Sequence, residues 1–384
     1  MARGWRYKVE AAVLALFGLM GLLFLLHGDD GSSGRASGGT GGPFTPSPTA
    51  APETPPPPPA PSATRTVCQE NRTAATLAGF ADLPAHIQDF LRFRHCRDFP
   101  LLLDQPEKCS GEVFLLLAIK SWPGNYERRE MIRRTWGQER AVAGLPVRRV
   151  FLSGVAPGGA LEARRLNRLL RLEAAEHGDV LQWAFHDTFF NLTLKQSLFH
   201  AWLEARCPSA RFLLNGDDDI FAHTDNLVGY LQGVPGAGRQ HLFVGHLIAH
   251  VGPIRERWSK YYVPEQVTSA TAYPPYCGGG GLLMSGYTAG AIRRASLGLP
   301  LFPIDDVYLG MCLERAGLAP ASHAGVRMVG VRLPSATLDP LDPCYFRELL
   351  LVHRFVPYEM LLMWRALRRP GLACGRHLEV YPSL

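Results

Sequence analysis

The sequence has no block of lysines and arginines, no zinc-finger spacing of cysteines and histidines, and no aromatic RNA-binding signature. Its formal net charge of +6 is spread over many separate arginines. Nucleic-acid binding normally uses a clustered basic surface, so we set this function aside. Internal repeats are also absent, and a hydrophobic content of 47% is too high for a chain that is disordered overall. The 384 residues can therefore bury a large core, in one large domain or two smaller ones.

The N-terminal residues predict a membrane anchor. Basic residues precede the apolar run Ala11 to Leu26, which is short for a plasma-membrane span but adequate for a thin early secretory membrane. A cleaved signal peptide is the alternative, although no small-residue cleavage site follows the run at once. Basic residues before the run and acidic residues after it favour a cytosolic N-terminus. We therefore expect a cytosolic tail at 1–10, a transmembrane signal-anchor at 11–26 and a type II topology.

A stalk is predicted at 27–66, which is rich in Gly, Ser, Thr and Pro and includes the run Pro55 to Pro59. Such a composition cannot bury a core and tends toward polyproline II. A ligand for a proline-recognition module is the alternative, but those modules are cytosolic. The lumenal domain, 67–384, contains all eight cysteines, and an even count in that compartment suggests disulfides. The sequons at Asn71 and Asn191 are candidate N-glycosylation sites.

Short apolar runs alternate with helix-like segments after residue 112. Strands are expected at 113–119, 147–154, 180–185 and 211–216, and helices at 126–136, 160–178 and 193–206. This alternation is typical of βαβ units. We therefore predict an α/β fold whose mostly parallel sheet is flanked by helices on both faces.

Three successive aspartates, Asp217 to Asp219, follow the expected strand at 211–216 in "LLNGDDDIFA". Their apolar flanks argue against a solvated acidic turn. An EF-hand also fails, because the sixth and twelfth positions counted from Asp217 hold Ala222 and Val228 instead of glycine and glutamate. Open α/β sheets bind ligands at the carboxyl ends of their strands. We favour a Mg or Mn ion that is held by one or two of these carboxylates and by the phosphates of a ligand.

Three further motifs fit a metal–diphosphate site, and each has a plainer alternative. The segment 125–137 contains four arginines, Arg128, Arg129, Arg133 and Arg134. Arginines of this kind bind phosphate or lie on a solvated helix face. The glycines at 278–281 serve either as a hinge or for close approach of the backbone to a ligand. Asp305 and Asp306 either cap the helix that follows them or supply a carboxylate base.

Six motifs occur together in an order typical of β1,3-glycosyltransferases. They are "RRTWG" at 133–137, "FFNLTLK" at 189–195, "GDDDIF" at 216–221, "YPPYCGGGG" at 273–281, "IDDVYLGMCL" at 304–313 and "LLLVHR" at 349–354. From residue 92 to 374 the sequence resembles this family, specifically its β1,3-N-acetylglucosaminyltransferases and, among them, enzymes that extend core 1 O-glycans. The resemblance implies a GT-A fold related to the Rossmann fold, a Golgi membrane location and Mn2+ as cofactor. It also implies UDP-GlcNAc as donor and a galactose-terminated glycan on glycoproteins as acceptor. Whether the protein forms a homodimer stays an open question.

The resemblance implies roles for individual residues. Asp306 corresponds to the catalytic base, and Asp219, His353 and Asp217 correspond to metal-binding positions, with Asp219 the expected direct ligand. The donor-binding positions are Arg128, Arg133, Arg134, Trp136, Asp187, Lys195 and Asp218. The acceptor-binding positions are Tyr276, Gly278, Gly279, Gly280 and Asp305.

Two residues depart from the family pattern. Asn215 stands where many relatives have lysine, so a lysine contact cannot be carried over to this position. Cys277 stands where many relatives have alanine or another small residue, and it could form a disulfide near the acceptor groove.

The implied reaction is an inverting transfer of N-acetylglucosamine to the 3-hydroxyl of a terminal galactose, on core 1 O-glycans or lactosamine chains. Mn2+ would neutralise charge on the leaving diphosphate, and Asp306 would remove the proton of the attacking hydroxyl. Two alternatives stay open. One is a β1,3-galactosyltransferase that uses UDP-Gal, because donor choice depends on the shape of the pocket. The other is a catalytically silent lumenal carbohydrate-binding protein.

Overall fold

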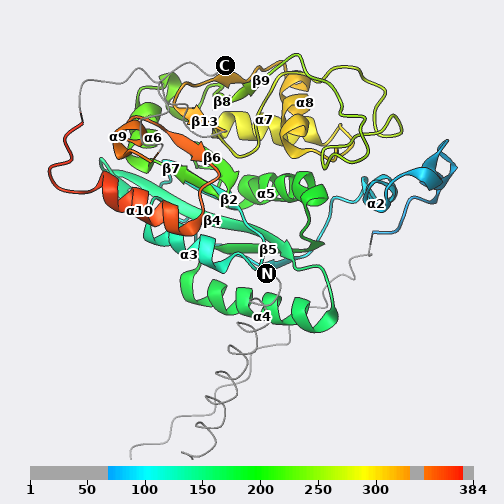
Figure 1. The fold of residues 1–384 in the computed structure, drawn as a ribbon, viewed down its shortest axis with the longest axis horizontal. Coiled ribbons are helices and arrows are strands. Elements are labelled where there is room, and N and C mark those ends of the chain that lie inside the picture. Colours follow the sequence, from blue (N-terminus) through cyan, green and yellow to red (C-terminus); the bar gives the residue numbers. More distant parts are fainter. Residues whose placement is uncertain (1–67, 329–340, 375–384) are drawn as a thin grey trace, which may run out of the picture. The chain divides into compact units, whose positions relative to one another are not determined.

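The computed structural model describes residues 68–328 and 341–374, which are coloured in Figure 1. The predicted cytosolic tail, signal-anchor and stalk lie outside these residues. Within the two described ranges, no helix has both the length and the apolar character needed to cross a membrane.

A nine-stranded mixed sheet with the order β1-β5-β4-β2-β6-β11-β8-β12, and with β3 paired to β4, forms the centre of the fold. Its four central strands run parallel: β5 (Val180–His186), β4 (Leu145–Val155), β2 (Leu115–Lys120) and β6 (Phe212–Asp217). The other strands are β1 (Leu101–Leu103), β3 (Ala141–Val142), β8 (Phe243–Gly245), β11 (Gly281–Ser285) and β12 (Ala321–Ser322). The predicted α/β fold is confirmed, and its parallel character holds for the central strands. The whole sheet is mixed because β11 runs antiparallel to both β6 and β8.

Helices cover both faces of the sheet, and the first three of those named next connect its central strands (Figure 1). They are α3 (Tyr126–Arg134), α4 (Ala160–His177), α5 (Leu192–Arg206), α6 (Thr224–Gln232), α7 (Gly286–Ser296), α8 (Asp305–Arg315) and α10 (Pro357–Leu367). Alternate residues of β2 belong to different cores, because successive side chains of a strand point to opposite faces. Leu115 and Leu117 join the core with α3, α4, α6 and α10. Leu116 and Ala118 join the core with α5, α7 and α8. A strand buried on both faces explains the continuous apolar run.

Two small sheets lie beside the central one. One contains β13 (Val326–Arg327), β14 (Leu351–His353) and β7 (Ile220–Ala222), in that order. The other pairs β9 (Leu247–Ile248) with β10 (Tyr276–Cys277). Because β7 follows the three aspartates directly and pairs with β14, the "LVHR" motif is brought to the end of β6.

The remaining elements are short. They are η1 (Arg72–Thr76), η2 (Phe80–Asp82), α2 (Ala85–Phe93), η3 (Phe189–Asn191), η4 (Pro235–Gly238) and α9 (Pro343–Phe346). The side chain of the sequon residue Asn71 is exposed and caps η1 through the backbone N–H of Thr73. The second sequon residue, Asn191, is half-buried and donates from Nδ2 to the carbonyl oxygen of His186.

Three disulfides confirm what the even cysteine count suggested: Cys68–Cys96, Cys109–Cys207 and Cys344–Cys374. The suggested disulfide at Cys277 is wrong, because this cysteine is free and buried. Its Sγ lies 3.6 Å from the carbonyl oxygen of Ala321, and burial raises the pKa of the thiol to about 12. Cys277 therefore acts as a small packing residue behind the glycines.

Candidate functional site

The ends of β2 and β6 lie side by side in a parallel register that pairs Lys120 with Asp217. The Nζ atom of Lys120 lies 3.0 Å from Oδ1 of Asp217 and 2.8 Å from Oδ2 of Asp305, the first residue of α8. Burial would lower the pKa of Lys120, but the charges of Asp217 and Asp305 outweigh it and raise the pKa. Lys120 therefore supplies the positive charge that a cluster of aspartates requires. The sequence analysis did not single out Lys120, although this residue ends the apolar run that forms β2.

Asp217, Asp219 and His353 form a group that could hold a metal ion, since their ligand atoms all lie within 4.8 Å of one another. Nε2 of His353 lies 3.2 Å from Oδ1 of Asp219, and Nδ1 lies 3.3 Å from the carbonyl oxygen of Met328. A proton on Nδ1 would be donated to this carbonyl, which leaves the lone pair of Nε2 for a metal. Two carboxylates and an imidazole suit a divalent ion such as Mn2+. The structure thus brings together the three residues that the motifs implied.

The electrostatics of this group also suit a cation. Burial would raise the pKa of Asp219, but the hydrogen bond and charge of His353 hold it below the usual value. Burial would lower the pKa of His353, and Asp219 instead raises it. Each partner thus stabilises the charged form of the other. A metal ion at this position would take over the role of the imidazolium charge.

Glycine is required where the turn before β11 approaches His353. A Cβ atom at Gly280 would lie 2.7 Å from Cγ of His353 and 2.9 Å from Sδ of Met328. At the preceding position, the N–H of Gly279 donates to Oδ2 of Asp306 over 3.2 Å. Gly280 therefore permits close approach to the implied metal ligand His353, and Gly279 contacts the implied base Asp306 through its backbone. Their predicted contact with an acceptor, together with that of Gly278, stays a prediction.

Asp305 and Asp306 begin α8 but differ in their partners. Asp305 does not cap the helix, because Ile304 is the N-cap residue and the carboxylate of Asp305 is bound to Lys120. The oxygens of Asp306 accept hydrogen bonds from the backbone N–H groups of Val307, at 2.8 Å, and Gly279. Burial and then the charge of Asp305 raise the pKa of Asp306 to about 7. A carboxyl group with such a pKa can accept a proton near neutral pH.

Tyr276, the remaining acceptor-binding prediction, lies on β10 and is half-buried. Burial and then the charge of Asp306 raise the pKa of its phenol to about 12. The ring of Tyr273 lies edge-on at 6.4 Å from that of Tyr276. An acceptor sugar near Asp306 would thus have aromatic surface beside it.

The middle aspartate, Asp218, is held by the protein itself. Its Oδ2 accepts hydrogen bonds from Ser121 Oγ at 2.7 Å and from Asn125 Nδ2 at 2.9 Å, and its Oδ1 accepts one from Arg128 Nη1 at 3.1 Å. Arg128 also lies 3.5 Å from Oδ2 of Asp219. The predicted donor-binding residue Asp218 therefore has both carboxylate oxygens occupied. Ser121 and Asn125 are functional candidates that the sequence did not indicate beyond their place just after β2.

An open cleft of about 260 Å³ lies at this end of the sheet. It is lined by Lys120, Ser121, Trp122, Arg128, Asp187, Thr188, Phe189, Leu192, Lys195, Asp217, Asp218 and Asp219. Lys195 and Asp187 are buried and form an ion pair of 2.8 Å in its wall. The predicted donor-binding residues Arg128, Asp187, Lys195 and Asp218 therefore share one cleft with the two aspartates of the metal group.

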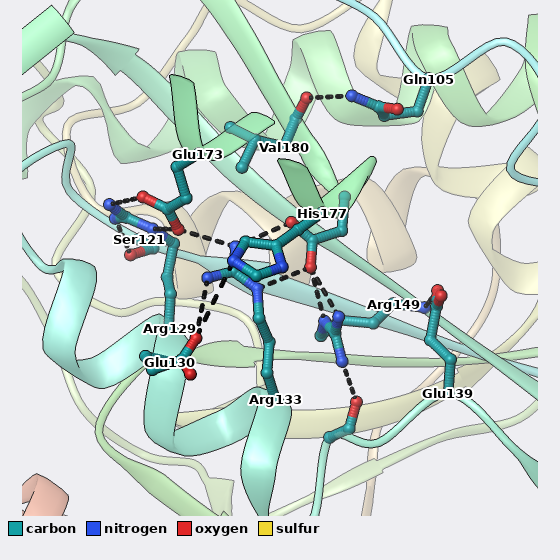
Figure 2. A network of polar contacts seen from close by, with 12 residues as sticks. Gln105, Ser121, Arg129, Glu130, Arg133, Glu139, Arg149, Glu173, His177 and Val180 are labelled. Carbon is teal, nitrogen blue, oxygen red and sulfur yellow. Dashed lines mark hydrogen bonds and ion pairs between the residues drawn. The ribbon is translucent and has the colours of Figure 1, made fainter. Parts of the chain in front are cut away.

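Three predicted donor-binding residues do not reach this cleft. Arg133 projects from α3 and is bound to Glu173 on α4 and to Asp179 in a buried network (Figure 2). Arg134 is exposed and pairs with Glu130, and Trp136 is buried in the core. The physical reason is the helical period: the face of α3 that carries Arg133 packs against acidic residues, whereas Arg128 lies on the side that faces the cleft.

The sequence of the chain is similar to those of known glycosyltransferases. Residues 127–324 match a family model described as Galactosyltransferase. The chain is 62% identical over 316 residues to "N-acetyllactosaminide beta-1,3-N-acetylglucosaminyltransferase 3" of Homo sapiens, covering 82% of this chain and 84% of that protein. It is 63% identical over 313 residues to the "Acetylgalactosaminyl-O-glycosyl-glycoprotein beta-1,3-N-acetylglucosaminyltransferase" of Homo sapiens, covering 80% and 81%. Among solved structures, the galactosyltransferase LgtC aligns at 14% identity with a TM-score of 0.33, over 67% of this chain and 97% of that one.

Proposed function

Because the chain belongs to the galactosyltransferase family, as one of its β1,3-N-acetylglucosaminyltransferases, we propose that the cleft transfers N-acetylglucosamine in β1,3 linkage to galactose. The acceptors are core 1 O-glycans or lactosamine chains, the two classes that the names of the relatives indicate. This proposal is supported above all by one observation: Asp217, Asp219 and His353 lie together at one end of the sheet. Lys120 connects this group to the start of α8 through its contacts with Asp217 and Asp305.

We propose UDP-GlcNAc as the donor and Mn2+ as the metal, within a GT-A type of fold. Asp217, Asp219 and His353 would hold the ion, and their mixed oxygen and nitrogen ligands support this assignment. When bound, the ion supplies positive charge to the diphosphate of the leaving UDP. Arg128 adds a second positive charge in the same cleft. The basic Lys195 stays paired with Asp187 and shapes the wall.

The chain's own residues divide the chemical work. Asp306 accepts the proton of the galactose 3-hydroxyl as this oxygen attacks the anomeric carbon, and a single displacement inverts the configuration there. Lys120 contacts Asp217 on one side and Asp305 on the other, so it fixes the distance between the donor end and the base end of the site. Lys120 also donates to the carbonyl oxygen of Gly279, over 3.2 Å. Positioning of this kind removes much of the entropic cost of bringing two substrates together.

The pH dependence follows from Asp306. Because burial and the charge of Asp305 raise the pKa of Asp306 to about 7, a large fraction of the enzyme carries a protonated base at mildly acidic pH. We expect kcat/KM to fall as the pH decreases through this value and to level off above it, since only the carboxylate accepts a proton. A pH profile of kcat/KM under saturating Mn2+ checks this. A profile that is flat through neutral pH would show that no group with this pKa acts as the base.

A direct assay tests the proposed function. The purified full-length chain is incubated in detergent with Mn2+, a galactose-terminated O-glycan acceptor and either UDP-GlcNAc or UDP-Gal. We expect transfer from UDP-GlcNAc, and loss of this transfer when a chelator is added and recovery when Mn2+ is restored. Preferential transfer from UDP-Gal would make the chain a galactosyltransferase. Absence of transfer from both donors would make it a silent binding protein.

We also propose that the segment 11–26 anchors the enzyme in the Golgi membrane, with 1–10 in the cytosol, 27–66 as a stalk and 67–384 in the lumen. The basic residues before the apolar run at 11–26 support this orientation. Protease added to intact Golgi vesicles should leave the 67–384 region undigested until detergent is present. Digestion of that region in intact vesicles would place it on the cytosolic side.

A further inference from the structure

Arg129 is almost completely buried, with an exposed fraction of 1%, and all of its contacts are defined. Its Nε and Nη2 atoms donate to the two carboxylate oxygens of Glu173 on α4, at 2.7 and 2.8 Å. The guanidinium also donates to the carbonyl oxygens of Trp122 and Pro123, at 2.7 and 2.9 Å. One contact is left, from Nη1 to Oγ of Ser121 over 2.9 Å. Because Ser121 lines the cleft, this hydrogen bond connects the buried arginine to the candidate site.

Glu173 is itself immobilised by a larger ion network, which Figure 2 shows. Arg133 bridges it to Asp179 with bonds of 2.7 and 2.8 Å. Arg149 binds the same Asp179 over 2.6 Å. Burial would raise the pKa of Glu173, but the hydrogen bonds and charges of Arg129 and Arg133 hold it low, so the carboxylate stays ionised. Arg129 therefore has a rigid, charged anchor.

The chemistry of the guanidinium fixes the direction of the Ser121 hydroxyl. Arginine donates hydrogen bonds and cannot accept them, so Oγ of Ser121 must be the acceptor toward Arg129. The one hydroxyl hydrogen of Ser121 is then free to point toward Oδ2 of Asp218, 2.7 Å away. Without Arg129, this hydroxyl could rotate to other acceptors. The buried arginine thus turns a rotatable hydroxyl into a fixed donor for the middle aspartate.

Asp218 in turn controls the two aspartates of the metal group. Asp218 lies between them in the turn that joins β6 to β7, so hydrogen bonds that hold its side chain also restrain the backbone of both neighbours. Nη1 of Arg128 contacts Asp218 and Asp219 together, at 3.1 and 3.5 Å, which further couples their positions. The ligand atoms of Asp217, Asp219 and His353 lie within 4.8 Å of one another.

The backbone of the turn is tied to its surroundings at both ends, because the N–H of Asp217 donates to the carbonyl oxygen of Gly280 at 3.0 Å and the N–H of Phe355 donates to that of Asp219 at 2.7 Å. Between these two bonds, the side chain of Asp218 supplies the remaining restraint.

We propose that Arg129 is a positioning residue for the aspartate turn 217–219, acting through the hydroxyl of Ser121 on Asp218. The proposal rests on the proposed function, because it assigns the turn to binding of Mn2+ and the diphosphate of the donor. The arginines of α3 then have two different roles. Arg128 lines the cleft, whereas Arg129 is buried and positions Asp218 through Ser121.

A double-mutant cycle on UDP binding tests this inference, with the dissociation constant of UDP measured by calorimetry in Mn2+ on the full-length chain. Ser121→Ala removes the oriented hydroxyl, and Arg129→Lys keeps the charge but loses the planar fork. We expect each variant to bind UDP about tenfold more weakly, the size that loss of one hydrogen bond to a charged group produces. Because Arg129 acts through Ser121, the double variant should bind no more weakly than Ser121→Ala alone. Ser121→Thr, which keeps a hydroxyl, should bind like the wild type.

Arg149→Lys is the matched control, because Arg149 belongs to the same buried network but does not contact Ser121. We expect a lower melting temperature and an unchanged UDP affinity. If Arg129→Lys does not fold, Glu173→Gln takes its place in the cycle, since it weakens the anchor and leaves the arginine in the chain. Independent, additive losses in the cycle, or wild-type affinity in Ser121→Ala, would overturn the inference. These outcomes are separate from the proposed function, which fails only if the wild-type chain transfers no N-acetylglucosamine to galactose.

Discussion

Replacing Asp306 with asparagine should reduce transfer by about two orders of magnitude or more, which is the range seen when a general base is removed. Asparagine keeps the shape of the side chain, and its oxygen can still accept the N–H of Val307 or Gly279. It cannot take a proton from the acceptor hydroxyl. The interaction that is lost exists only in the transition state, so kcat should fall while UDP binding in Mn2+ stays near the wild-type value.

The measurement is a comparison of kcat, UDP affinity and melting temperature for the wild type and Asp306→Asn. Asp225→Asn is the control, because Asp225 is half-buried on α6 and pairs with Arg140 and Arg368 outside the cleft. This control should retain full activity. If Asp306→Asn instead melts early or loses UDP binding in parallel with activity, Asp306 is a structural residue or a donor ligand, and the base lies elsewhere.

Replacing Asp219 with alanine should weaken Mn2+-dependent UDP binding by at least about 100-fold. Loss of a residue that merely supports a metal ligand costs about 10–100-fold, so loss of a direct ligand should reach or exceed the upper end of that range. Asp219 is also the carboxylate that pairs with His353, so its removal leaves the imidazole without its partner. Activity should fall together with binding, in contrast to Asp306→Asn.

Calorimetric titration of UDP with and without Mn2+ checks this second expectation. The wild type should show strong binding that depends on the ion, and Asp219→Ala should show weak binding in both conditions. Asp225→Ala, which removes an aspartate outside the cleft, should bind UDP like the wild type. UDP affinity that survives in Asp219→Ala and still depends on Mn2+ would remove Asp219 from the set of metal ligands.

Several features of the fold and site follow from local patterns in the sequence. The parallel core could be predicted because strands buried on both faces produce continuous apolar runs, and β2 alternates between two cores. The position of the three aspartates could also be predicted, because they directly follow the apolar residues that form β6. The convergence with His353 could be expected from the family resemblance alone, because β14 reaches β7 through a pairing between segments distant in sequence.

Other features depend on packing that the sequence does not display. The helical period of α3 indicates that Arg129 and Arg133 share a face. It does not indicate that this face packs against the carboxylates of Glu173 and Asp179. An exposed or phosphate-binding face and a buried ionic face therefore look alike in the sequence. Lys120 is a similar case, because its pairing with Asp217 requires the register of β2 against β6, and its pairing with Asp305 requires the placement of α8. Cys277 appeared available for a disulfide, and only the fold shows that it is buried without a cysteine partner.

In the proposed reaction, this cleft forms a β1,3 bond between N-acetylglucosamine and galactose by a single inverting displacement. The most direct test is proton NMR and linkage analysis of the product that the full-length chain makes from UDP-GlcNAc and a galactose-terminated acceptor. We expect a new anomeric proton with the large coupling of a β-linked N-acetylglucosamine, attached to a 3-substituted galactose. An α-linked product would contradict a single displacement with Asp306 as its base, and substitution at another hydroxyl of galactose would contradict the β1,3 linkage.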